Sequence, residues 1–209
     1  MAKERGGTAP LQRRCRELTG VSAVVDGADA ASFTVAGPPV DTIPAGATAD
    51  WTVTFAPATP GNKTAALHFA GNGVNNIFEV TLAGKALSSL EVWKEFYFES
   101  SVNEGISANN ADPDQDGLEN LLEFAFGLDP AVPDASLQPK WSFKGDDVVL
   151  SFTTPENVSG ITYAVEYNTS LSAAGWAGIP NSATLPERVY HAPAAGARRL
   201  FLRLRVTVP

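Results

Sequence analysis

Residues 112–123 read DPDQDGLENLLE and place acidic side chains at short, regular intervals. Asp112, Asp114 and Asp116 are two residues apart, Gly117 follows directly, and Glu123 closes the stretch. Carboxylates this close repel one another, so the stretch needs a physical reason. A bound cation, a solvated turn and an acid/base pair could each supply that reason.

The spacing matches the EF-hand calcium loop, D-x-[DN]-x-[DN]-G-x₅-E, at every defined position. Calcium takes six to eight oxygen ligands, which alternate side chains of a tightly wound loop supply, and a glycine permits the sharp turn. Asn120 would act directly or through water, and Glu123 would give two oxygens. The predicted calcium ligands are Asp112, Asp114, Asp116, the carbonyl of Leu118, Asn120 and Glu123. Bound calcium would turn the mutual repulsion into local folding free energy.

The acidic loop also has three alternatives to a calcium site. Aspartates favour helix starts, so the stretch fits a polar loop with an N-cap. Magnesium is disfavoured because a bidentate Glu123 suits the larger ion. A glycosidase-like carboxylate pair is disfavoured because the sequence suggests no substrate groove near the loop.

Helical patterns flank the acidic loop on both sides. Trp93, Phe96 and Tyr97 share one helical face in SSLEVWKEFYFES, and Ser88 with Glu91 has capping-box spacing. After the loop, LENLLEFAFG repeats apolar residues at helical spacing and ends at Gly127. We expect two short helices that pack their aromatic faces together around the loop.

The rest of the chain alternates with period two, which indicates strands. DWTVTF and FEVTL do so before residue 86, and DDVVLSF, ITYAVEY and RRLFLRLRVTV do so after residue 138. The expected fold is mainly β: two β-sandwiches joined by a short helix–calcium loop–helix segment. The predicted boundaries are a tail at 1–17, domains at 18–86 and 138–209, and a helical calcium-binding linker at 87–137.

Composition excludes several classes of function. The 209 residues carry a net charge of −8, which argues against nucleic acid and anionic membranes as partners. No apolar run is long enough to span a membrane, and the basic first residues lack the apolar core of a signal peptide. No nucleophile elbow, phosphate loop or zinc spacing occurs, so no enzyme is predicted. The single Cys15 permits no disulfide within the chain.

Residues 18–86 resemble the immunoglobulin-like choice-of-anchor D domain. The resemblance lies in the GADAASF start at 27–33, PAG at 44–46, VTFAP at 53–57, GNKTAAL at 61–67 and LAG at 82–84. The first strand of that family is not recognisable here, and residues 1–17 stand in its place. The resemblance implies an immunoglobulin-like sandwich and suggests a truncated or mis-started chain.

The stretch DPDQDGLENLLEFAFGLDP resembles the calcium-binding repeats of the thrombospondin type 3 and dockerin types. Those repeats hold calcium on one loop and its exiting helix, without a paired EF-hand. The closing GLDP is part of the same pattern, and Asp129 is expected to make a turn rather than to contribute a ligand. Residues 91–209 as a whole are similar to a C-terminal β module of large secreted bacterial proteins.

These observations predict a non-enzymatic, calcium-binding structural, adhesion or display region of a bacterial surface or secreted protein. A lone extracellular site of this kind binds calcium at roughly 10⁻⁴ to 10⁻³ M. Two alternatives stay open: a carbohydrate-binding accessory region of a secreted hydrolase, for which Trp141 and Trp176 are the aromatic candidates, and an intracellular immunoglobulin-like scaffold. The β domains are also expected to bind a protein or polysaccharide ligand, which the sequence does not specify.

Overall fold

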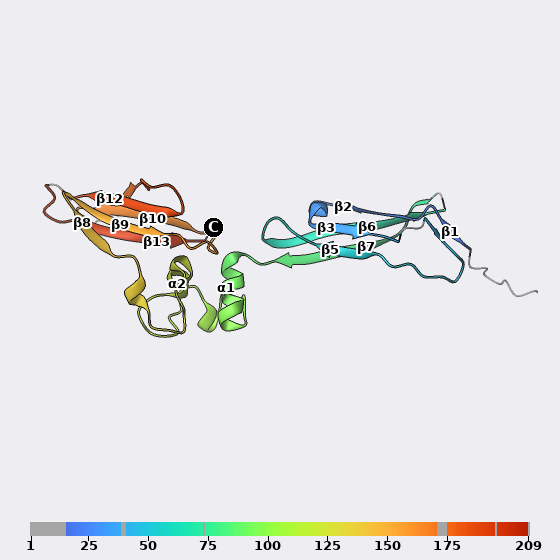
Figure 1. The fold of residues 1–209 in the computed structure, drawn as a ribbon, viewed down its shortest axis with the longest axis horizontal. Helices are drawn as coiled ribbons and strands as arrows, with labels where there is room; N and C mark the ends of the chain where they lie inside the picture. The colour runs from blue at the N-terminus through green and yellow to red at the C-terminus, as the bar shows by residue number, and fades with distance from the viewer. Residues whose placement is uncertain (1–15, 39–40, 73, 171–174, 195, 209) are drawn as a thin grey trace, which may run out of the picture. The chain divides into compact units, whose positions relative to one another are not determined.

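The computed structural model describes residues 16–38, 41–72, 74–170, 175–194 and 196–208. Its chain is mainly β and divides into two compact units, at Met1–Ala86 and Leu87–Pro209 (Figure 1). Nearly all of the predicted tail, residues 1–15, lies outside the described part. No helix in the described ranges is long and apolar enough to cross a membrane.

The described residues of the first unit form three small antiparallel sheets. One has the order β2-β6-β7, a second pairs β3 with β5, and a third pairs β1 with β4. The strands are β1 (Leu18–Thr19), β2 (Ser22–Asp26), β3 (Phe33–Ala36), β4 (Thr42–Ile43), β5 (Thr52–Phe55), β6 (Gly61–Gly71) and β7 (Val74–Ala86), with a 3₁₀ turn at Ala30–Ser32. The predicted strands DWTVTF and FEVTL are therefore confirmed as β5 and part of β7.

Alternate residues of β6 form the best-buried surface of the first unit. Ala65, Leu67 and Phe69 are each at most 7% exposed, as period-two alternation on a one-sided sheet requires. Phe69 lies against the rings of Trp51 and Phe78, with centroids 5.1 and 4.4 Å away. Phe78 nevertheless remains 52% exposed, so this face of β7 is only partly covered.

In its described residues, the second unit begins with two α-helices and continues into two three-stranded antiparallel sheets. The sheets have the orders β12-β9-β8 and β11-β10-β13. The helices are α1 (Ser89–Phe98) and α2 (Asn120–Phe126), with 3₁₀ turns η2 (Gly105–Ser107) and η3 (Ala135–Leu137); the strands are β8 (Trp141–Lys144), β9 (Asp147–Thr153), β10 (Thr162–Asn168), β11 (Ala177–Ile179), β12 (Glu187–Pro193) and β13 (Phe201–Thr207).

One apolar core joins the two sheets of the second unit. It takes Leu150 from β9 and Tyr190 from β12 on one side, and Val165 from β10 and Ile179 from β11 on the other. Leu202 and Leu204 of β13 pack against it. The predicted strands DDVVLSF, ITYAVEY and RRLFLRLRVTV are confirmed as β9, β10 and β13, whereas β8, β11 and β12 were not predicted.

Both helices follow their sequence signals closely. The Ser88 side chain accepts from the Glu91 N–H, and the Glu91 side chain accepts from the Ser88 N–H, which is the predicted capping box. Gly127 ends α2 in the left-handed region at φ 70°. The helix α2 begins at Asn120, so Leu118 belongs to the preceding loop rather than to the helix.

The helices pack together and also against the sheets that follow them. Trp93 of α1 lies edge-on to Phe124 of α2, with ring centroids 5.8 Å apart, in a cluster that includes Val158 from the loop before β10. The hydroxyl of Tyr163 in β10 donates to the carbonyl of Ala125, at 2.5 Å. The segment predicted as a linker, residues 87–137, therefore belongs to the same compact unit as the sheets that follow it.

Candidate metal centre

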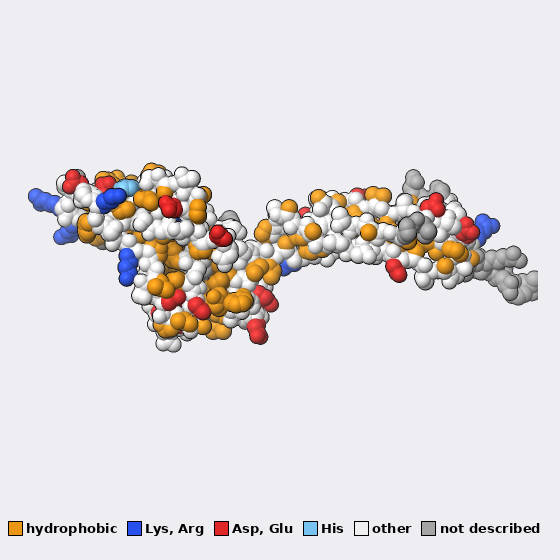
Figure 2. Space-filling view, in the orientation of Figure 1, with side chains coloured by type: hydrophobic (Ala, Val, Ile, Leu, Met, Phe, Trp, Pro, Cys, Tyr) orange, Lys and Arg blue, Asp and Glu red, His pale blue; other side chains and the backbone are white. Residues whose placement is uncertain are grey.

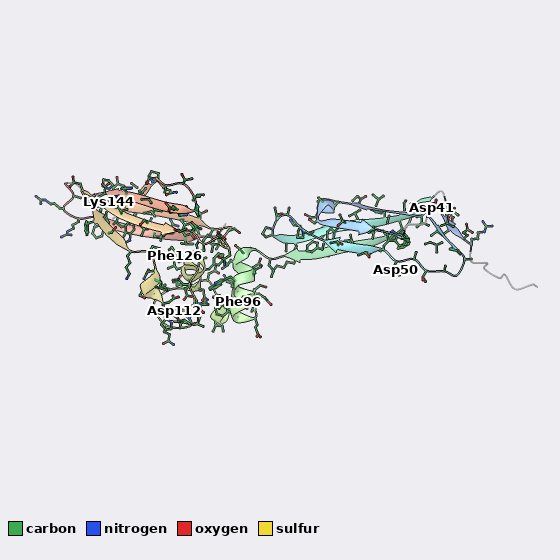
Figure 3. All side chains as sticks on the ribbon, in the orientation of Figure 1. Asp41, Asp50, Phe96, Asp112, Phe126 and Lys144 are labelled. Atoms are coloured by element: carbon green, nitrogen blue, oxygen red, sulfur yellow. The ribbon has the colours of Figure 1, made fainter. Side chains whose placement is uncertain are left out.

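The loop of residues 112–118 winds tightly before α2 begins. Its backbone has positive φ at Gln115, 62°, and at Gly117, 95°, the second being the position where the calcium-loop pattern demands glycine. The Gly117 N–H donates to Asp112, at 3.0 Å, the Asp116 N–H to Asp114, at 3.2 Å, and the Leu118 N–H to Asp116, at 2.9 Å. The aspartates therefore turn inward onto their own loop. Figure 3 shows Asp112 in this loop, beside the two helices.

The structure brings the predicted acidic residues into two overlapping groups. In one group, carboxylate oxygens of Asp112, Asp114 and Asp116 lie within 4.8 Å of one another. In the other, Asp116, Glu123 and Asp134 do the same. Asp116 belongs to both groups, so the acidic cluster is continuous from the loop through α2 to the segment that follows it.

Glu123 is the most unusual side chain of the cluster. It is 0% exposed, and neither of its carboxylate oxygens has a hydrogen-bond partner. Burial raises its pKa from 4.5 to about 7, and repulsion from Asp114, Asp116 and Asp134 adds to the shift. A buried carboxylate without partners is costly unless it is neutral or bound to a cation.

Desolvation also raises the pKa of Asp114, and repulsion from Asp116 and Asp112 acts in the same direction. The hydrogen bond from the Asp116 N–H opposes this shift because it favours the charged form. Burial and the neighbouring carboxylates therefore disfavour the ionised form of Asp114.

Unpaired buried atoms are concentrated at this centre. Among the described residues, every buried side-chain nitrogen or oxygen without a hydrogen-bond partner lies between residues 109 and 134, and all seven are oxygens. They belong to Asn109, Asp112, Asp114, Asn120, Glu123 (two atoms) and Asp134. Native proteins leave few such atoms unpaired, and a cluster made only of acceptors is what a cation would satisfy.

The structure constrains the two remaining predicted ligands differently. Asn120 is 0% exposed, and its amide nitrogen donates to the carbonyls of Ile106 and Ala108, at 2.8 and 2.7 Å. Its amide oxygen has no hydrogen-bond partner, so ligation through that atom stays a prediction. Leu118 is buried at 4% exposure, with its N–H held by Asp116, and ligation by its carbonyl also stays a prediction.

Asp134 is an acidic residue of the cluster that the sequence pattern did not reveal. It follows Glu123 by eleven residues, beyond the helix end and Pro130, so no loop spacing points to it. Asp129, in contrast, accepts from the Ala131 N–H at 3.0 Å, and its carbonyl accepts from the Val132 N–H, which confirms the predicted turn.

Outside the acidic cluster, both aromatic candidates for carbohydrate binding make contacts with the rest of the second unit. Trp141 packs against the core of the second unit. Trp176 carries the guanidinium of Arg203 over its ring, 4.0 Å from the centroid, and Arg203 is also bonded to Glu166 at 2.6 Å. A sugar stacking on Trp176 would need its opposite face or would have to displace this arginine.

No family model matches this chain, and a search of curated proteins finds no match. The resemblances noted in the sequence therefore remain expectations, and the function must be inferred from the geometry of the acidic centre.

Proposed function

We propose that the second unit is a calcium-binding structural module, with Asp112, Asp114, Asp116 and Glu123 as side-chain ligands. The carbonyl of Leu118 and the side chain of Asn120 are proposed to complete the loop set. The observation that carries the proposal is Glu123, which is fully buried with two unpartnered oxygens among further carboxylates. A divalent cation neutralises this cluster and supplies the missing partner of those oxygens.

The proposed role is mechanical rather than catalytic. Without a cation, repulsion within the loop opposes the fold, so bound calcium stabilises the loop and the first turn of α2. Each unit is proposed to be an immunoglobulin-like β-sandwich, a view supported in the second unit by two antiparallel sheets around one core. Such a module suits extension, adhesion or display on a bacterial surface or in a secreted protein.

Calcium titration of the whole protein tests this proposal. At a calcium concentration about 100 times the Kd, binding adds about 2.7 kcal/mol to the free energy of unfolding. Wild type is expected to release or absorb heat on calcium addition and to melt at higher temperature, while Asp114→Ala and Glu123→Ala respond much less. Calorimetry and thermal denaturation, with a chelator in the reference sample, measure both effects.

Glu119→Gln is the matched control. Glu119 lies in the same loop, is exposed, and belongs to neither acidic group. Its substitution removes one negative charge without removing a ligand, so calcium should still stabilise this variant. Equal responses of Glu119→Gln and Glu123→Ala would refute the assignment of ligands.

The measured affinity for calcium also distinguishes an extracellular from an intracellular location of the protein. A Kd of about 10⁻⁴ to 10⁻³ M fits a site that fills outside cells. A Kd of about 10⁻⁷ to 10⁻⁵ M would instead fit calcium levels sensed inside cells and would favour the intracellular scaffold.

A further inference from the structure

Asp134 stands apart from the loop in sequence but not in space. One of its carboxylate oxygens lies within 4.8 Å of oxygens of Asp116 and Glu123, although α2, its glycine end and a proline separate it from them along the chain. Asp134 reaches this place at the start of η3, on the path that leads to β8.

The backbone around Asp134 is fixed to the loop by Asp116. The Asp134 N–H and the Ala135 N–H both donate to Oδ2 of Asp116, at 2.8 and 2.5 Å. Oδ1 of Asp116 accepts from Leu118. Asp116 therefore holds the start of η3 beside the loop, and Oδ2, with two donors on its two lone pairs, has little capacity left for a cation.

The carboxylate oxygens that have no hydrogen-bond donor are the ones available to bind the cation. Oδ1 of Asp134 is buried without a partner, while its Oδ2 accepts from the Asp129 N–H at 3.3 Å. Asp112 and Asp114 each offer one buried unpaired oxygen, and Glu123 offers two. With Oδ1 of Asp116, these acidic side chains offer five oxygens, and the proposed Leu118 carbonyl and Asn120 side chain bring the set to seven. Calcium takes six to eight oxygen ligands, so the set has room for one oxygen from Asp134.

We propose that Asp134 is a direct ligand of the same cation and supplies one further side-chain oxygen. The inference rests on the proposed calcium site and adds a ligand that lies outside the 12-residue loop. The acidic cluster is supported by an independent observation, the fully buried and unpartnered Glu123 carboxylate that belongs to the same group.

A ligand at this position changes what the ion does. The cation would bridge the loop before α2 and the segment after it, and so hold both ends of the helix. The chain entering β8 would then be fixed to the acidic loop by the ion as well as by Asp116.

The test compares Asp134→Asn with Glu119→Gln in the whole chain. Each substitution removes one negative charge, and asparagine keeps an oxygen that can accept from Asp129. Asp134→Asn should weaken calcium binding by about tenfold or more. Losing a residue that only supports a metal ligand already costs about tenfold in affinity, so losing a direct ligand should cost at least as much. Glu119→Gln should change the Kd by about twofold or less, because salt screens an exposed charge.

A second measurement separates ligation from support of the fold. Terbium in place of calcium reports its number of bound waters through the luminescence lifetime in H₂O and D₂O. Asp134→Ser, whose side chain is too short to reach the ion, should gain one bound water relative to wild type, whereas Glu119→Gln should gain none.

The outcomes are distinct. If wild type binds calcium, Asp134→Asn matches Glu119→Gln in affinity and Asp134→Ser gains no bound water, Asp134 is not a ligand and the loop site stands without it. If Asp134→Ser loses stability but keeps the wild-type number of waters, Asp134 acts only in the fold, and the inference is overturned. If wild type binds no calcium, the proposed function fails as well.

Discussion

At the scale of single residues, the carboxylates of the acidic loop and of Glu123 are the groups with unusual surroundings. Asp112, Asp114 and Asp116 each accept a hydrogen bond from an N–H group of their own loop. These bonds hold the loop in its tight turn. Glu123 has no such donors and is fully buried. The acidic loop therefore stabilises its own turn but leaves Glu123 dependent on a proton or a cation.

This dependence predicts how the metal-free protein responds to pH. The pKa of Glu123 is raised from 4.5 to about 7, so across that window the folded state keeps a proton that the unfolded chain has lost. The folded state binds more protons there, and stability must fall as the pH rises. Chelator-treated wild type should melt at a lower temperature just above this window than just below it, beyond the change shared by all variants.

Glu123→Gln removes the titrating group and should reduce this loss of stability, while Glu119→Gln should retain it. Melting curves of the three proteins across the window give the comparison. An unchanged pH profile in Glu123→Gln would mean that another group is responsible.

At the scale of elements, the proposed metal site depends on the packing of two short helices. A seven-residue helix such as α2 has little stability alone, so tertiary contacts must hold it. Phe124 is 1% exposed between α1 and the loop before β10, and the Tyr163 hydroxyl binds the helix backbone at Ala125. The helix that carries Glu123 is thereby attached to the sheets.

The aromatic face predicted for α1 is only partly right. Trp93 is buried at 8% exposure, but Phe96 is 78% exposed, because α2 covers one side of the stripe and leaves the opposite side uncovered. Figure 2 shows apolar and acidic side chains side by side on this part of the second unit.

Phe124 and Phe96 therefore form a matched pair for mutation. Phe124→Ala should lower the free energy of unfolding by about 3–5 kcal/mol, since it leaves a cavity between the helices. Phe96→Ala should change it by about 0.5 kcal/mol or less, as is usual at exposed positions. Denaturant titration measures both, and similar losses for the two variants would contradict the packing of α1 against α2.

At the scale of the whole molecule, every residue of the acidic centre belongs to the second unit. The effect of calcium should therefore be local to that unit. The cation should suppress the opening of the amides that donate to the loop aspartates, which are those of Asp116, Gly117, Leu118, Asp134 and Ala135.

Hydrogen exchange with and without calcium tests this locality. Protection should rise in peptides covering residues 112–135 and remain unchanged in peptides from β6. Added protection across β6 of similar size would show that the two units respond as one.

The sequence by itself determined the features that depend on neighbours along the chain. These local features are the strand alternation, the Ser88 capping box, the Gly127 helix end and the acidic spacing of residues 112–123. Each depends on residues close in sequence, because strands, helix ends and tight loops are built from short-range backbone geometry. Tertiary structure alone decided the burial of Glu123, the engagement of Asn120 by two distant carbonyls, and the approach of Asp134 to the loop. Each depends on where the chain returns after a helix and a turn, and that path is set by packing against the sheets rather than by residue spacing.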